Sequence, residues 1–232
     1  MNEVAGLNLS RRAWLAHCTS LAALTAFAGL AAQPLDAHAA ASAPGKILVV
    51  GDSLSAEYGL VRGSGWVSLL EKRLAQEKID ASVVNASISG DTTSGGRARL
   101  ADLLKRHQPT LVILELGGND ALRGLPLSMT QENLDTMART SKDAGARVLI
   151  VGMQVPPNYG RKYSDEFAAL FSTVAKKQGA QLVPFLLKGV ADVPDSEKLF
   201  QPDRIHPKAE AHPTILANVW PVLRPMLAAG KK

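Results

Sequence analysis

The sequence is poor in cysteine and in aromatic side chains, and each shortage excludes a class of protein. Its single cysteine, Cys18, lies in the first forty residues, so the rest of the chain holds no disulfide, no thiolate nucleophile and no cysteine metal ligand. Aromatic residues make up 5%, and no run of lysine and arginine is dense enough for nucleic acid, so no nucleic-acid partner is expected. Hydrophobic residues at 46% and charged residues at 20% instead favour a packed globular domain.

Residues 1–39 have the order of features found in an export signal. Positive charge in "SRRAWL" precedes an apolar run at Leu21–Ala32, and the small-x-small pattern "AHAA" follows at Ala37–Ala40. The apolar run is shorter than the roughly 20 residues that span a bilayer. We therefore expect residues 1–39 to be a signal peptide that is cleaved, of either the twin-arginine or the ordinary export type. The mature protein would be periplasmic or secreted and would keep no stable membrane anchor.

From Gly45 onward, short apolar runs alternate with amphipathic segments. The apolar runs predict strands near residues 46–51, 81–87, 110–118, 147–153 and 181–186. The segments that separate and follow them predict helices near 66–78, 95–107, 128–145, 164–179 and 207–227. Such alternation predicts one domain over residues 45–230, a doubly wound, three-layer α/β sandwich with a parallel sheet of about five strands.

Single residues add detail to the predicted elements. Ser128 with Gln131 reads as a capping box at the start of the third helix, and Ser164 reads as the N-cap of the fourth. Pro184 favours an edge position for the last strand because proline cannot donate to a ladder.

Unusual polar residues follow the predicted strands. The first strand ends in "GDSLS", the second in "NASISGDTT" and the third in "LGGND", and a late loop carries "PDRIHP". Open parallel sheets bind ligands outside the carboxyl ends of their strands, at the point where the strand order reverses. We therefore expect these four segments to meet at one edge of the sheet.

The residue types in these segments suit nucleophilic acyl transfer. Serine is a weak nucleophile that needs a base within hydrogen-bond reach, itself oriented by a third group. Ser53 is the expected nucleophile, His206 the base and Asp203 the carboxylate that fixes the imidazole. The backbone N–H of Ser53, the N–H of Gly90 and the side-chain amide of Asn119 are the expected oxyanion donors.

The four segments resemble, in order, the four blocks of the GDSL, or SGNH, hydrolases. Longer stretches such as "VVNASISGDT" and "LELGGNDALRG" look like the bacterial periplasmic acyl-CoA thioesterase I, lysophospholipase L1 and arylesterase group. The resemblance implies a cofactor-free Ser–Asp–His hydrolase of carboxylic esters and thioesters on a flavodoxin-like sheet, with no metal and with an acyl-enzyme at Ser53. Its partner would be a small-molecule acyl ester or lysophospholipid.

Substrate contacts are expected in two loops. In relatives the loop after the third-block asparagine can shift when acyl chains bind, and here that loop would be Asp120–Pro126. Apolar residues there and after the fourth strand favour acyl chains. The residues expected to bind substrate are Asp120, Leu122, Leu125 and Pro156.

Other interpretations stay open. Ser55 is a second candidate nucleophile, although a turn or cap role is favoured for it. Glu115, in a central strand, is either a buried carboxylate paired with Arg97 or Arg99, which is favoured, or a catalytic group. The same triad could act on acetylated carbohydrate. A non-catalytic, flavodoxin-like binding protein would leave the Asp-x-x-His spacing unexplained, and the absence of a G-x-S-x-G motif argues against an α/β-hydrolase.

Overall fold

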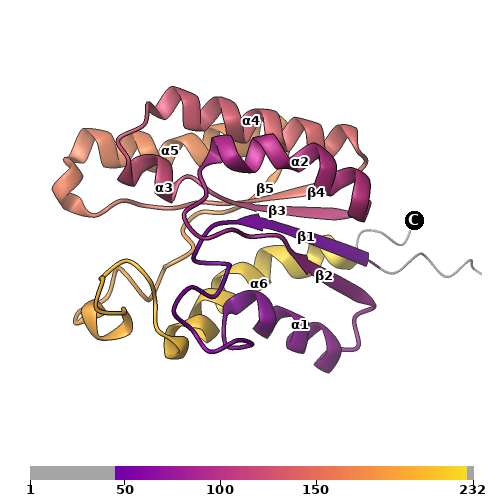
Figure 1. Ribbon diagram of the computed structural model, residues 1–232, viewed down its shortest axis with the longest axis horizontal. Coiled ribbons are helices and arrows are strands. Elements are labelled where there is room, and N and C mark those ends of the chain that lie inside the picture. The colour runs from indigo at the N-terminus through magenta and orange to yellow at the C-terminus, as the bar shows by residue number, and fades with distance from the viewer. Residues whose placement is uncertain (1–44, 229–232) are drawn as a thin grey trace, which may run out of the picture. The chain divides into compact units, whose positions relative to one another are not determined.

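The computed structural model describes residues 45–228, and these form a parallel sheet with helices on both faces (Figure 1). The expected signal peptide at 1–39 lies outside the described residues and stays a prediction. Five parallel strands run in the order β2-β1-β3-β4-β5. They are β1 (Gly45–Gly51), β2 (Ala81–Asn85), β3 (Leu111–Glu115), β4 (Arg147–Val151) and β5 (Gln181–Val183). The order reverses between β1 and β3, so the predicted flavodoxin-like, three-layer fold is confirmed.

Helices cover the two faces of the sheet unequally. One face carries α2 (Thr93–His107), α4 (Leu127–Asp143) and α5 (Arg161–Gln178), and the other carries α1 (Trp66–Gln76) and α6 (His212–Ala228) (Figure 1). A short helix, α3 (Gly118–Leu122), follows β3 directly. Single 3-10 turns lie at η1 (Pro157–Tyr159), η2 (Ser196–Leu199) and η3 (Ala209–Ala211). No helix among the described residues is both long and apolar enough to cross a bilayer.

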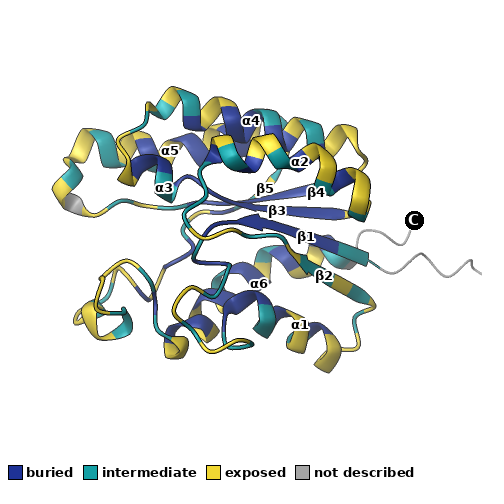
Figure 2. Ribbon diagram, viewed as in Figure 1, coloured by how far each residue is buried: buried dark blue, intermediate teal, exposed yellow. Residues whose placement is uncertain are grey.

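The pattern of the strands explains why both faces are covered. In β1, Ile47 and Val49 enter the core under α1 and α6, whereas Leu48 and Val50 enter the core under α2, α4 and α5. Successive strand residues point to opposite faces, so a continuous apolar run needs helices on both sides. All five residues of β3 are buried, and Figure 2 shows the sheet as the dark centre of the molecule.

Two predicted helix caps are wrong. The helix α4 begins at Leu127 after Pro126, with no side-chain cap, because the φ of −58° at Pro126 already suits entry into a helix. The helix α5 begins at Arg161, so Ser164 lies within its first turn, where its hydroxyl donates to the Gly160 carbonyl at 3.0 Å. The expected edge position of the last strand is confirmed, since β5 stops just before Pro184.

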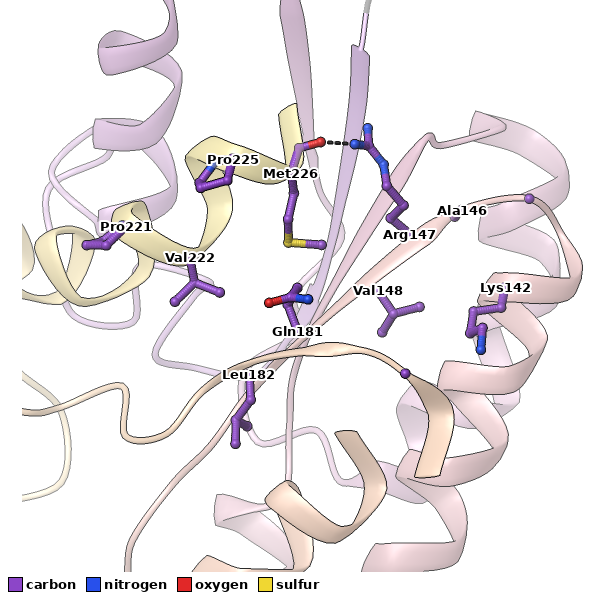
Figure 3. A pocket seen from close by; sticks show the side chains of 12 residues that line it. Lys142, Ala146, Arg147, Val148, Gln181, Leu182, Pro221, Val222, Pro225 and Met226 are labelled. Carbon is purple, nitrogen blue, oxygen red and sulfur yellow. Dashed lines mark hydrogen bonds between the residues drawn. The ribbon is translucent and has the colours of Figure 1, made fainter. Parts of the chain in front are cut away.

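A cavity of about 720 Å³ lies at the amino ends of β4 and β5 (Figure 3). Arg147, Gln181 and Met226 are among its lining residues, and the Arg147 guanidinium donates to the Met226 carbonyl there. None of the expected catalytic residues lines this cavity. The polar segments that the sequence singles out lie instead at the carboxyl ends of the strands.

Candidate active site

The four polar segments meet at one edge of the sheet. Ser53 lies two residues beyond β1, Gly90 in the loop after β2, Asn119 in α3 after β3, and His206 in the loop before η3 and α6. Figure 1 shows these connections together at the carboxyl ends of the strands. The switch point between β1 and β3 therefore brings together residues from both ends of the described chain.

Ser53, His206 and Asp203 form a continuous hydrogen-bonded chain. The Oγ of Ser53 lies 2.8 Å from His206 Nε2, and His206 Nδ1 lies 2.7 Å from Asp203 Oδ2. The second carboxylate oxygen, Asp203 Oδ1, accepts the backbone N–H groups of Ile205 and His206 at 2.9 and 3.0 Å. A carboxylate at Nδ1 keeps the proton on that nitrogen, so Nε2 is left to accept the serine proton.

Asp203 stays charged because its surroundings favour the anion. Desolvation opposes ionisation, but the N–H groups of His206 and Ile205 and the imidazole together lower its pKa to about 2. A fixed negative charge beside Nδ1 is what stabilises an imidazolium during proton transfer.

Two residues that sequence reasoning missed support the His206 loop. The Tyr58 ring lies against the imidazole, with ring centroids 4.3 Å apart and planes tilted by 38°. Gln201 donates its backbone N–H to the His206 carbonyl at 2.8 Å and its side-chain amide to the Tyr58 carbonyl at 2.9 Å. The loop that carries the imidazole is thus tied to the loop that carries the serine. No motif marks either residue.

Two of the three expected oxyanion donors, Asn119 and Gly90, belong to residues that a neighbour holds in place. Asn119 Nδ2 donates to Asp52 Oδ2 at 3.0 Å; an amide nitrogen carries two hydrogens, so this bond uses one and orients the other. Gly90 has a φ of +78°, which glycine adopts without strain. Its carbonyl accepts a hydrogen bond from Arg123 at 2.7 Å, which fixes the adjoining peptide.

Beneath the serine lies a group that we call the floor: Asp52, Ser55 and Glu115. Glu115 is the register partner of Gly51, and its Oε2 accepts the Ser55 hydroxyl at 2.7 Å and the Asp52 N–H at 3.4 Å. Asp52 Oδ1 accepts the Leu54 N–H at 3.0 Å. A Cβ on Gly51 would come within 2.8 Å of the Glu115 carboxylate, so a side chain there would displace the floor.

The two floor carboxyls hold protons more tightly than ordinary ones. Burial raises the pKa of Asp52 to about 6, although hydrogen bonds from Leu54 and Asn119 and the charge of His206 oppose the rise. Burial, followed by the negative charge of Asp52, raises the pKa of Glu115 well above its usual range. Both carboxyls of the floor are thus shifted toward the protonated form.

The expected pairing of Glu115 with an arginine is wrong. Arg99 instead pairs with Asp91 at 2.8 Å, and Arg97 donates to Asn133 at 3.0 Å. Among the described residues Glu115 forms no ion pair, and burial raises its pKa instead.

The structural interpretation of Ser55 is confirmed. Its hydroxyl is buried, donates to Glu115 and accepts the Trp66 indole N–H at 3.2 Å. This hydroxyl is therefore bonded to Glu115 and Trp66 and not to the His206 imidazole.

The residues expected to bind substrate divide into two sets. Leu122 and Pro156 are exposed and Leu125 is half-buried, at the edge of the sheet that carries Ser53. Asp120 is different, and the expectation that it binds substrate is wrong because its side chain is fully buried. Its carboxylate accepts the Thr93 N–H at 2.9 Å and the Thr93 and Thr130 hydroxyls, so it fastens α3 to α2 and α4.

Comparison with known proteins points to the same chemistry. The family model described as the GDSL-like lipase/acylhydrolase family matches residues 49–213. Esterase TesA of Pseudomonas aeruginosa is 51% identical over 78% of this chain and 89% of its own length. Thioesterase 1/protease 1/lysophospholipase L1 of Escherichia coli K12 is 40% identical over 81% of this chain and 87% of its own. A crystal structure of TesA, 51% identical, aligns with a TM-score of 0.75 over 78% of this chain and 99% of that one.

Proposed function

The chain belongs to the GDSL-like lipase/acylhydrolase family and is an ester hydrolase of the SGNH type, and we propose that it works through an acyl-enzyme at Ser53. The substrates would be carboxylic esters and thioesters of fatty-acyl or aryl type. The observation that carries this proposal is the continuous chain from Ser53 Oγ through His206 to Asp203, with contacts of 2.8 and 2.7 Å.

In the proposed reaction His206 transfers a proton in each of two steps, first from Ser53 to the leaving group and then from water to Ser53. Nε2 takes the Ser53 hydroxyl proton as Oγ attacks the acyl carbon, and the carbonyl oxygen becomes an oxyanion facing the Ser53, Gly90 and Asn119 donors. When the carbonyl re-forms, the bond to the alcohol or thiol breaks and the imidazolium protonates this leaving group. Water, deprotonated by the same nitrogen, then releases the acid and restores Ser53.

The substrate class is supported by apolar residues in the loops at the carboxyl ends of the strands. Leu122 and Pro156 are exposed and Leu125 is half-buried, so acyl or aryl groups have apolar surface to cover. A relative that is itself named a thioesterase and lysophospholipase supports both leaving groups. A panel of p-nitrophenyl esters from acetate to palmitate, with a lysophospholipid and an acyl-thioester beside them, measures the preference.

We also propose that residues 1–39 are removed during export to the periplasm or the medium. The charged, apolar and small-residue segments in that order support it. Sequencing the amino terminus of the native protein checks it, since an intact Met1 would contradict cleavage.

The nucleophile is tested by substitution and by trapping. We expect Ser53→Ala to lose about 10⁴-fold or more in kcat on p-nitrophenyl esters while its Tm stays near that of the wild type. A phosphonate ester should label the peptide containing Ser53 in the wild type, and mass spectrometry locates the label. Ser55→Ala is the matched control, because it removes the other candidate hydroxyl and should still be labelled. Label retained in Ser53→Ala would refute the assignment.

A further inference from the structure

The large apolar side chains that the described part of the chain exposes are concentrated around the triad. They are Val61 at 82%, Ile88 at 52%, Tyr58 at 50%, Leu122 at 47% and Ile205 at 44% of their full exposure. All five belong to the segments 52–65, 86–92, 116–126 and 200–208, which also carry Ser53, Gly90, Asn119 and His206. We call these four segments the rim. Single exposed apolar residues are ordinary, but such a concentration marks an interaction surface.

Contacts and sequence position place four of these residues near the reacting groups. The Tyr58 ring lies 4.3 Å from the His206 ring, and Ile205 precedes that histidine. Ile88 donates its N–H to the Gly51 carbonyl at 3.0 Å, next to the serine turn. Leu122 adjoins the arginine that holds the Gly90 carbonyl. The apolar residues therefore border access to the triad from several loops.

The carboxylates of the rim are all engaged within the protein. Asp52 and Asp120 are buried, and Glu57 accepts the N–H groups of Gly63 and Gly65 at 2.7 to 3.1 Å. The remaining two, Asp91 and Asp203, bond Arg99 and His206. Each rim carboxylate is thus held in place by partners within the protein.

The basic side chains of the rim are arranged in the opposite way. Arg62, Arg123 and Arg204 are exposed, and none of them forms an ion pair within the described residues. Arg62 follows Val61, Arg123 follows Leu122 and Arg204 precedes Ile205, so each exposed arginine stands next to an exposed apolar residue. The rim thus combines apolar side chains with unpaired positive charge.

We propose that the rim docks on an anionic lipid surface, so that acyl substrates enter the site directly from the lipid. Apolar residues interleaved with arginines are the composition that binds the boundary of a negatively charged bilayer. The choice of a lipid rests on the proposed function. A protein seated on the rim would cover Ser53, whereas a lipid surface that covers it supplies the acyl substrate.

The test measures vesicle binding by protein that cannot turn over lipid. A Ser53→Ala chain is purified from cells that express the full sequence, so any processing is the cell's own. Binding to vesicles of phosphatidylglycerol and phosphatidylcholine is compared with binding to phosphatidylcholine alone. We expect tighter binding to the anionic vesicles, weakened about tenfold by Val61→Ser and about fivefold by Arg62→Gln.

Lys105→Gln is the matched control, because it removes the same charge from the last turn of α2, at the opposite edge of the sheet. It should leave vesicle binding nearly unchanged. Equal losses in Arg62→Gln and Lys105→Gln would reveal attraction by net charge alone and overturn the proposal. Equal binding to both kinds of vesicle, or none, would also overturn it.

Activity and association separate the remaining outcomes. With Ser53 restored, Val61→Ser and Arg62→Gln should hydrolyse a short, soluble p-nitrophenyl ester at the wild-type rate; a loss there would assign the two residues to the substrate site instead. A dimer that dissociates on Val61→Ser would assign the rim to a second copy of the chain. Vesicle binding is measured on the inactive Ser53→Ala protein. Its result therefore does not depend on whether the proposed ester chemistry is correct.

Discussion

Two aspartates close to the same histidine have opposite surroundings. Asp203 lies in the 200–208 loop, partly exposed, where backbone N–H groups and the imidazole overcome desolvation and lower its pKa to about 2. Asp52 lies in the floor at the ends of β1 and β3, where burial raises its pKa to about 6. The loop therefore favours the charged form of its carboxylate, whereas the floor under Ser53 favours the protonated form.

In the proposed reaction the two carboxylates would accordingly serve in different ways. Asp203 touches the imidazole and would stabilise the charge that forms on it. Asp52 acts through Asn119 and the Leu54 N–H, and it is a positioning residue. A substitution at Asp203 in the loop should therefore lower kcat with little change in stability. A substitution in the floor should instead alter how stability depends on pH.

The largest expected effect comes from breaking the loop with Asp203→Asn. The amide cannot carry the charge and favours the wrong tautomer of His206, so kcat should fall about 10⁴-fold. The Tm should change little because the side chain is partly exposed. Asp195→Asn is the control, since this exposed aspartate pairs only with Lys198. A kcat within about tenfold of wild type would show that His206 holds its tautomer without Asp203.

The triad could be predicted because its clues are local. Asp203 and His206 are three residues apart, Pro207 keeps the histidine extended, and Ser53 directly follows a buried strand. The alternation of strands and helices then supplies the switch point that joins the two ends. Local spacing and a general topological rule were enough for this part of the site.

The floor could not be predicted because its partners depend on register. Glu115 meets Ser55 only because β3 pairs with β1 so that Gly51 lies opposite it. The burial of Asp120 likewise depends on Thr93, 27 residues away, and not on its neighbour Asn119. Ser164 resembles an N-cap, yet the helix begins three residues earlier. The sequence does not distinguish a serine at the N-cap from a serine in the first turn.

A smaller effect is expected where the floor meets the oxyanion donors. Asn119→Ala removes the amide that Asp52 orients, and the loss of one such donor costs about 10²–10³-fold in kcat. KM should change much less, because the donor acts on charge that develops in the transition state. Asn218→Ala serves as a control, since that amide also bonds backbone carbonyls but lies in α6. A rise in KM at constant kcat would make Asn119 a binding residue.

The smallest effect on activity, and the sharpest test of the floor, is expected from Glu115→Gln. The pKa of Glu115 is raised by folding, so the folded state binds more protons than the unfolded chain above pH 4.5. Its contribution to stability therefore declines as the pH rises from 4.5 toward the raised pKa. Glutamine stays neutral and still accepts the Ser55 hydroxyl, so the variant should escape this decline.

Glu77→Gln gives the opposite sign and so controls the experiment. Hydrogen bonds from Arg73 and Arg224 lower the pKa of Glu77 despite some desolvation, so its contribution is present above pH 4.5 and is lost on acidification. As the pH rises, the Tm of Glu115→Gln relative to wild type should increase. The Tm of Glu77→Gln relative to wild type should decrease. In a domain of this size about 1 kcal/mol corresponds to about 2–4 °C. A Glu115→Gln profile parallel to wild type would mean that folding does not raise the pKa of Glu115, and it would contradict a floor that favours the protonated form.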